Sequence, residues 1–164
     1  MNRLLPGFVG DLHKRCRSIQ QMLESPVTYP ELSGYVAAIY AEAERVRRGI
    51  QRLAEDPDLG TPEVASDHLR TYKQLAEQVY ILEAFPLPAI TRYGEKDRYF
   101  TRLVQKLASQ VGYPLPPPIV TAFSSEYYQS YPAFNLVEVP TGEDAFLLGL
   151  ADLGHELGHI LYRT

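Results

Sequence analysis

Apolar residues recur every three or four positions through most of the first 112 residues, which is the spacing of one face of an α-helix. The pattern predicts a short helix around residues 9–23, a longer one over about 30–53, a third over about 63–82 and a fourth over 95–111. The apolar positions that define them are Val9, Leu12, Cys16, Ile19, Leu23, Leu32, Val36, Ile39, Ala43, Val46, Ile50, Leu53, Leu69, Tyr72, Leu75, Ala76, Val79, Leu82, Phe100, Leu103, Val104 and Leu107. The second and third helices are expected to form an antiparallel hairpin, and two closely spaced prolines are expected to end the third.

The pattern changes at the proline-rich segment 113–118, which cannot continue a helix and is expected to form an extended connector. Beyond it, short apolar runs predict strands over 119–123 and 134–139, which could pair as a hairpin. The sequence therefore predicts an α+β fold that is predominantly α. It consists of a helical bundle region over residues 1–112, the connector, and a strand-strand-helix unit over 119–164.

The last predicted helix runs from Gly142 to Arg163, a stretch without proline that is rich in leucine, alanine and glutamate. Thr141 can cap it, and Glu143 and Asp144 favour its positive end. Apolar residues make up most of its surface, which would place its two histidines in or near a core. These apolar residues are Phe146, Leu147, Leu150, Leu153, Leu157, Ile160 and Leu161.

This helix carries an H-E-x-x-H motif formed by His155, Glu156 and His159. Two histidines four residues apart project from one helix face about one turn apart, where both imidazoles can reach a single Zn²⁺. Glu156 then lies beside the metal, where its carboxylate can take a proton from metal-activated water. Asp152 shares roughly the same face. It could be a third ligand, an acceptor for a ring N–H, or an ordinary surface aspartate.

With these residues the chain resembles the zincin metallopeptidases over about its last 45 residues. That family prefers uncharged residues at four positions between and just after the histidines, and this chain has Leu157, Gly158, Ile160 and Leu161 there. The resemblance implies that His155 and His159 ligate zinc and that Glu156 is the general base and proton shuttle. It also implies an edge strand shortly before the helix, against which a peptide substrate lies extended, and residues 134–139 look like that strand.

Three tyrosines between the two predicted strands, Tyr127, Tyr128 and Tyr131, have two interpretations. Zincins often use a tyrosine or histidine as donor to the oxyanion, which makes these residues candidates for that role or for substrate contact. Packing on a face of the sheet is the more common use of tyrosine at such positions.

The positions that follow the motif supply no third zinc ligand. Tyr162 stands where the metzincin branch has a glycine, and the gluzincin-like branch takes its third ligand from an acid on a later helix. No Asp or Glu follows Glu156, and the sequence stops without the glycine or proline that usually ends a helix. We therefore expect an N-terminal portion of a longer metallopeptidase. His13 or His68 could also be brought to the metal by folding, although a partly buried or surface histidine is more common.

Composition narrows the possible partners. A net charge of −4 and a pI near 5.6 do not indicate the basic surface that binds nucleic acid or an anionic membrane. Basic residues cluster only on the second predicted helix, where Glu42 and Glu44 offer partners at helical spacing: Arg45, Arg47, Arg48 and Arg52. No apolar run approaches 18 residues and no signal peptide is evident. The single Cys16 cannot form an intrachain disulfide, so the cytoplasm is the expected location.

The sequence thus predicts a zinc-dependent metallopeptidase acting on a peptide or protein substrate, with the third ligand outside this chain. The helical region would be a scaffold, a binding site for a protein partner, or a gate for substrate. A toxin or regulatory protease with one protein substrate would share the same site. The alternative is a non-catalytic helical interaction module that keeps the H-E-x-x-H motif without activity.

Overall fold

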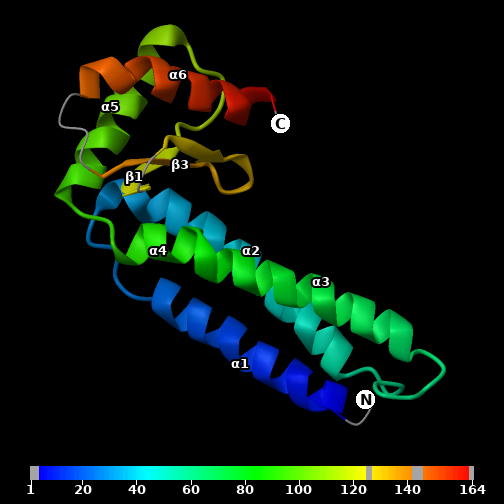
Figure 1. Cartoon of the computed structure of the whole chain (residues 1–164). Helices are drawn as coiled ribbons and strands as arrows, with labels where there is room; N and C mark the ends of the chain where they lie inside the picture. Colours follow the sequence, from blue (N-terminus) through cyan, green and yellow to red (C-terminus); the bar gives the residue numbers. More distant parts are fainter. Residues whose placement is uncertain (1–3, 125–126, 142–145, 163–164) are drawn as a thin grey trace. The chain divides into compact units, whose positions relative to one another are not determined.

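The computed structural model describes residues 4–124, 127–141 and 146–162 (Figure 1). The chain forms two compact units, one comprising Met1–Thr28 and Ser33–Pro88 and the other Tyr29–Leu32 and Ala89–Thr164. Helices predominate, and the described residues include a small three-stranded sheet in the second unit. The predicted α+β, predominantly α class is therefore confirmed.

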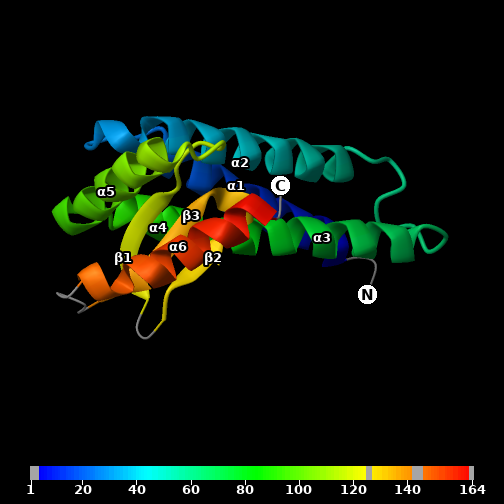
Figure 2. The ribbon, with the colours of Figure 1, turned by 90° about the horizontal axis from the view of Figure 1, so that it is seen from above.

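Three helices build the first unit: α1 (Leu5–Leu23), α2 (Ser33–Ala54) and α3 (Ala65–Ala84). They lie side by side, each running opposite to the one before, so the predicted hairpin of the second and third helices is confirmed (Figures 1 and 2). The predicted apolar stripes of the three helices meet in the core of this unit. The buried side chains include Val9, Leu12, Cys16, Ile19, Val36, Ile39, Ala43, Val46, Ile50, Val79 and Leu82. Polar contacts between helices flank this core, such as Gln20 Nε2 donating to Glu44 Oε2 at 2.7 Å.

Pro86 and Pro88 were expected only to end the third helix, but they also lie at the start of another helix. Pro86 follows α3 and begins a further short helix, α4 (Pro86–Thr91), which also contains Pro88. Proline fits the first turn of a helix because the N–H that it lacks would have no helical partner there. At the start of the second predicted helix, Pro30–Leu32 forms a separate 3₁₀ turn, η2, before α2 begins.

In the second unit, α5 (Glu95–Val111) has the bounds predicted from the sequence. It is followed by β1 (Ile119–Ser124), β2 (Gln129–Tyr131), β3 (Leu136–Pro140) and α6 (Phe146–Tyr162). The sheet order is β1-β3-β2, in which β1 and β3 are parallel and β2 and β3 are antiparallel. Any capping of α6 by Thr141 would involve residues 142–145, which lie outside the described residues.

The expected hairpin between residues 119–123 and 134–139 is therefore wrong, because these strands pair in parallel. The reversal of direction occurs instead between β2 and β3. A 3₁₀ turn, η3 (Pro132–Phe134), leads into Asn135, which adopts a left-handed backbone with φ 49° and donates its N–H to Pro132 O at 3.1 Å. Asparagine tolerates this conformation better than most residues, and here it completes the tight turn between β2 and β3. The hairpin of this sheet is therefore formed by β2 and β3.

One face of the sheet forms the core of this unit together with α5 and α6. Side chains from all three layers are almost fully buried in a single cluster: Phe100, Val104, Val120, Val137, Val139, Leu153 and Ile160. Val120 and Val137 are register partners, and Val139 follows at the two-residue spacing that returns a strand to the same face. The cluster therefore joins α5 and α6 to this face of the sheet.

Two polar side chains of α5 bind the outer edge of β1. Thr101, fully buried, donates its hydroxyl to Val120 O at 3.2 Å and accepts the Val120 N–H at 3.0 Å. Asp97 accepts the Ala122 N–H at 2.6 Å, while its other oxygen accepts the Gly94 N–H at 2.8 Å and caps α5. Buried backbone groups of a strand need partners, and these two side chains supply them where a further strand would otherwise pair.

The division into units differs from the expected boundary at residues 113–118. Helix α5 belongs with the sheet, and the proline-rich segment connects α5 to β1 within one unit. Asn135 Nδ2 donates to Pro116 O and Pro117 O at 3.1 and 3.3 Å, so this segment is bonded to the turn before β3. Among the described helices, none combines the length and apolar character needed to span a bilayer.

Two glycines inside helices provide a matched test of packing in the first unit. Gly10→Ala places a methyl group in open space on α1, so better helix propensity should raise the free energy of unfolding by about 0.5–1 kcal/mol. Gly49→Ala on α2 places its Cβ 2.8 Å from Leu75 Cδ2, so displacement of Leu75 should remove that gain. Urea denaturation compares the two variants. An equal stabilisation by both would contradict the packing of α2 on α3.

The bonds from Thr101 to β1 predict a specific stability cost. Thr101→Val keeps the shape of the side chain but leaves buried Val120 groups without a partner, which should lower the free energy of unfolding by about 1–3 kcal/mol. Ser109→Ala, which removes an exposed hydroxyl bond on the same helix, should cost less than about 0.5 kcal/mol. Urea denaturation measures both changes. Equal stability of the two variants would contradict the hydrogen bonds between Thr101 and the edge of β1.

Candidate metal centre

The candidate metal ligands lie on α6, whose orientation is set by its buried side. Leu153 and Ile160 are 1% and 2% exposed in the core cluster, and Leu157 packs against that cluster. Successive residues turn by about 100° around a helix, so His155 and His159 lie about 40° apart and more than about 90° from these leucines and the isoleucine. Both histidines are consequently exposed.

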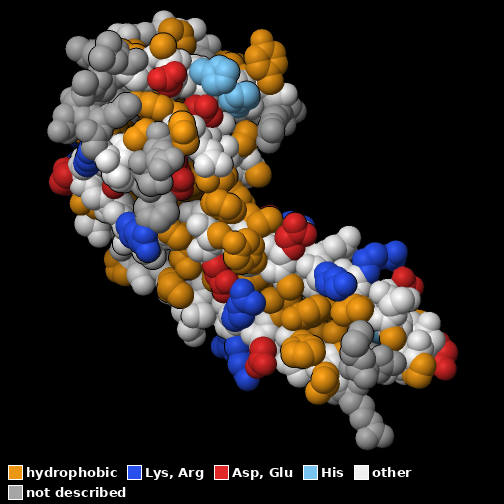
Figure 3. Space-filling model, in the orientation of Figure 1, with side chains coloured by type: hydrophobic (Ala, Val, Ile, Leu, Met, Phe, Trp, Pro, Cys, Tyr) orange, Lys and Arg blue, Asp and Glu red, His pale blue; other side chains and the backbone are white. Residues whose placement is uncertain are grey.

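The expectation that the histidines lie in or near a core is therefore wrong. The apolar stripe of α6 is narrower than its composition indicates: Leu150 and Leu157 are half-buried, and Leu161 is 36% exposed. The side chains of Phe146 and Leu147 lie outside the described residues. A patch of histidine side chains reaches the surface on the face drawn in Figure 3, close to acidic side chains.

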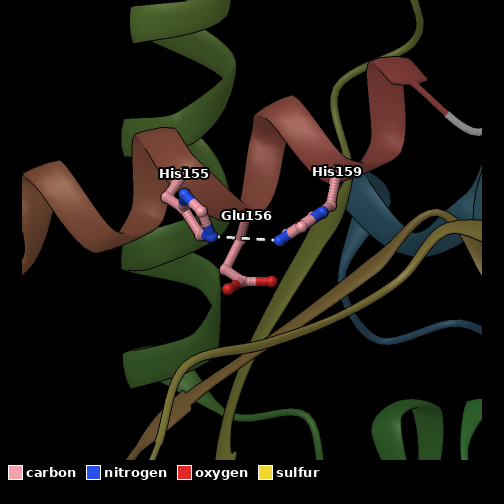
Figure 4. A group of neighbouring side chains, drawn as sticks. All are labelled: His155, Glu156 and His159. Carbon is pink, nitrogen blue, oxygen red and sulfur yellow. Dashed lines mark hydrogen bonds between the residues drawn. The ribbon is translucent and has the colours of Figure 1, made fainter.

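The two imidazoles converge on one point. His155 Nε2 and His159 Nε2 are 3.0 Å apart, and the rings meet edge to face with centroids 4.6 Å apart and an interplanar angle of 87°. Figure 4 shows Glu156 reaching to the same side of the helix, with its carboxylate beside the two rings. One ligand atom from each of the three residues lies within 4.8 Å of the others.

This arrangement could hold a metal ion. A hydrogen bond between two imidazole nitrogens requires one ring to carry the proton and the other to present its lone pair. A metal ion replaces that shared proton and uses both lone pairs, so the contact already brings the two donor atoms together. Glu156 is half-buried and adds a negative oxygen beside them. Among the described residues, these three form the group that could hold an ion.

Other predicted ligands lie elsewhere. Asp152 is exposed on α6 and is not part of the cluster. His13 and His68 belong to the first unit, and neither joins the cluster. His68 Nε2 lies 3.2 Å from Asp56 Oδ2, so His68 forms a hydrogen bond between α3 and the α2–α3 loop.

The three tyrosines before β3 have different surroundings. Tyr127 is 74% exposed, whereas Tyr128 packs against the core cluster, as the packing interpretation predicts. Tyr131 directs its hydroxyl to Glu138 Oε2 at 3.5 Å, and burial raises the pKa of Tyr131 to about 12. Burial also raises the pKa of Glu138. Tyr131 and Glu138 thus form a part-buried, hydrogen-bonded pair across β2 and β3.

Two features that bear on the site were not predicted from the sequence. β2 has three residues and no apolar alternation, so it carries too little pattern to be recognised as a strand. Tyr113, immediately after Gly112 at the end of α5, donates its hydroxyl to Leu157 O at 3.3 Å, within the turn that separates the two histidines. The sequence does show a tyrosine directly after a glycine that could end a helix. It contains no local pattern from which the contact of Tyr113 with Leu157 could be predicted.

Comparison of the chain with family models, with curated proteins and with solved structures found no match in any of the three.

The convergent nitrogens predict binding of a divalent transition metal. Co²⁺ or Zn²⁺ should bind with one ion per chain, and His159→Ala should weaken that binding by at least about 100-fold, because one of two imidazole donors is lost. Asp152→Ala is the matched control on the same helix face and should keep wild-type affinity. Titration with calorimetry measures each affinity. A loss in Asp152→Ala equal to that in His159→Ala would contradict the cluster.

Proposed function

We propose that α6 carries the zinc-binding part of a metallopeptidase site, with His155 and His159 as ligands and Glu156 as general base. The observation that carries this proposal is the 3.0 Å separation of the two Nε2 atoms with a carboxylate in the same cluster. Two nitrogens at about 2.0–2.1 Å from a tetrahedral Zn²⁺ lie about 3.3 Å apart. The pair needs to open by only a few tenths of an ångström, so the donor set fits zinc.

A bound Zn²⁺ would lower the pKa of a water molecule and polarise the scissile carbonyl. Glu156 then takes the proton of the attacking water and delivers it to the leaving amine, the two transfers that peptide hydrolysis requires. Glu156 is half-buried and belongs to the same cluster as the histidines, so its carboxylate lies close enough to serve both transfers. A catalytic zinc has three protein ligands, and we place the third outside the described part of the chain.

The substrate class that fits this site is an extended peptide. The zincin resemblance implies that substrate lies along an edge strand, which was expected to be residues 134–139. That segment forms β3, the central strand, and so cannot be the edge. β2 is an edge strand and α6 lies against it, whereas α5 side chains occupy the outer edge of β1. We therefore place the peptide on β2, where main-chain hydrogen bonds would hold it near the cluster.

The cytoplasm is the compartment that we propose for this activity. The single cysteine, Cys16, is a free thiol that is fully buried in the first unit, and burial raises its pKa to about 11. Such a thiol is unreactive and has no disulfide partner within the chain, which fits a reducing environment.

The general-base assignment has a direct test. Glu156→Gln keeps the size of the side chain but cannot take a proton, so casein hydrolysis by the zinc-loaded natural protein should fall by at least about 100-fold with zinc affinity retained. Asp152→Asn removes a carboxylate from the same face and should leave the rate unchanged. Zinc binding without hydrolysis in the wild type would instead support a non-catalytic interaction module.

A further inference from the structure

The end of α5 is fixed by a left-handed glycine. Gly112 has φ 66° and ψ 39°, and the next residue, Tyr113, donates its N–H back to Ala108 O at 2.9 Å. This is a common way to end a helix, and residues with a Cβ adopt that backbone conformation only with strain. The direction in which Tyr113 leaves the helix is thereby defined.

From this position the hydroxyl of Tyr113 reaches α6, 44 residues further along the chain. It donates to the carbonyl oxygen of Leu157 at 3.3 Å in a part-buried contact. Leu157 lies midway between His155 and His159, so the bond attaches to the backbone of the turn that carries both. A carbonyl oxygen has two lone pairs, so it can accept this bond in addition to its helical one.

The contact complements the apolar anchoring of α6. Leu153 and Ile160 hold the helix against the sheet through non-directional packing. A hydrogen bond is directional, and it restricts rotation of the helix and sliding along its axis, which apolar contacts allow more readily. Metal ligands bind well when their positions are fixed to within about 0.5 Å.

We propose that Tyr113 is a positioning residue for the metal cluster. Its hydrogen bond to Leu157 O holds the helical turn that carries His155 and His159. This inference rests on the proposed zinc site and adds the element that orients it. Burial raises the pKa of Tyr113, so the phenol remains a donor across the neutral range. Because the bond goes to backbone, it does not depend on which side chain occupies position 157.

The test uses Tyr113→Phe, which removes only the hydroxyl. Co²⁺ affinity should fall by about 3- to 10-fold, the effect of one hydrogen bond, and the visible spectrum of the cobalt-saturated chain should change because the two imidazoles are held less rigidly. Tyr99→Phe is the matched control, since Tyr99 lies on α5, the helix that Tyr113 follows, and is 62% exposed. It should retain wild-type affinity and spectrum.

A second variant separates positioning from general loss of stability. Gly112→Ala keeps the hydroxyl but strains the left-handed turn that directs it, so it should weaken Co²⁺ binding to a similar extent. The double variant Gly112→Ala/Tyr113→Phe should show little additional loss, because both changes break the same contact. Additive losses would overturn the proposal.

The outcomes also separate this inference from the proposed function. Cobalt binding by the wild type with unchanged affinity and spectrum in Tyr113→Phe would overturn the role of Tyr113 and leave the metal site standing. Absence of cobalt binding by the wild type would overturn both.

Discussion

The burial of Leu153 and Ile160 against the sheet is the constraint on which the candidate site depends. These two side chains lie seven residues apart on one side of α6 and are almost fully removed from water in a cluster with Val120, Val137 and Val139. Burying side chains of this size contributes about 1.5–3 kcal/mol each. Once that side faces the sheet, helix geometry turns His155 and His159 outward, where a metal ion and a substrate can reach them. The two candidate metal ligands therefore lie on the face of α6 that packing does not use.

The sheet imposes a second constraint, which concerns its edges. A strand edge exposes backbone donors and acceptors that pair readily with another strand. On β1 these groups are bonded by Thr101 and Asp97 of α5, so the sheet does not extend in that direction. β2 lies at the other edge and α6 lies against it. In the described sheet, β2 is therefore the edge on which the proposed peptide would add as a further strand.

Much of the fold follows from local pattern, and the exceptions have physical causes. The bounds of α5 follow from a period of 3.6 residues ended by Gly112, and both signals lie within the segment itself. The parallel pairing of β1 with β3 depends on a three-residue strand and on the left-handed Asn135, neither of which changes the hydrophobic pattern enough to be recognised. The spacing of His155 and His159 was sufficient to predict that the two imidazoles lie together in a cluster that could hold a metal ion. Their exposure was not predictable, because it depends on which part of an apolar helix the sheet covers.

The proposed site requires that His155 and His159 together hold a metal ion through their Nε2 atoms. X-ray absorption of the zinc-loaded protein measures this most directly, because imidazole ligands give both a short first shell and characteristic scattering from the outer ring atoms. We expect two imidazole nitrogens at about 2.0–2.1 Å from zinc, reduced to one in His159→Ala. Bound zinc without imidazole scattering, or with the same spectrum in His159→Ala, would contradict it.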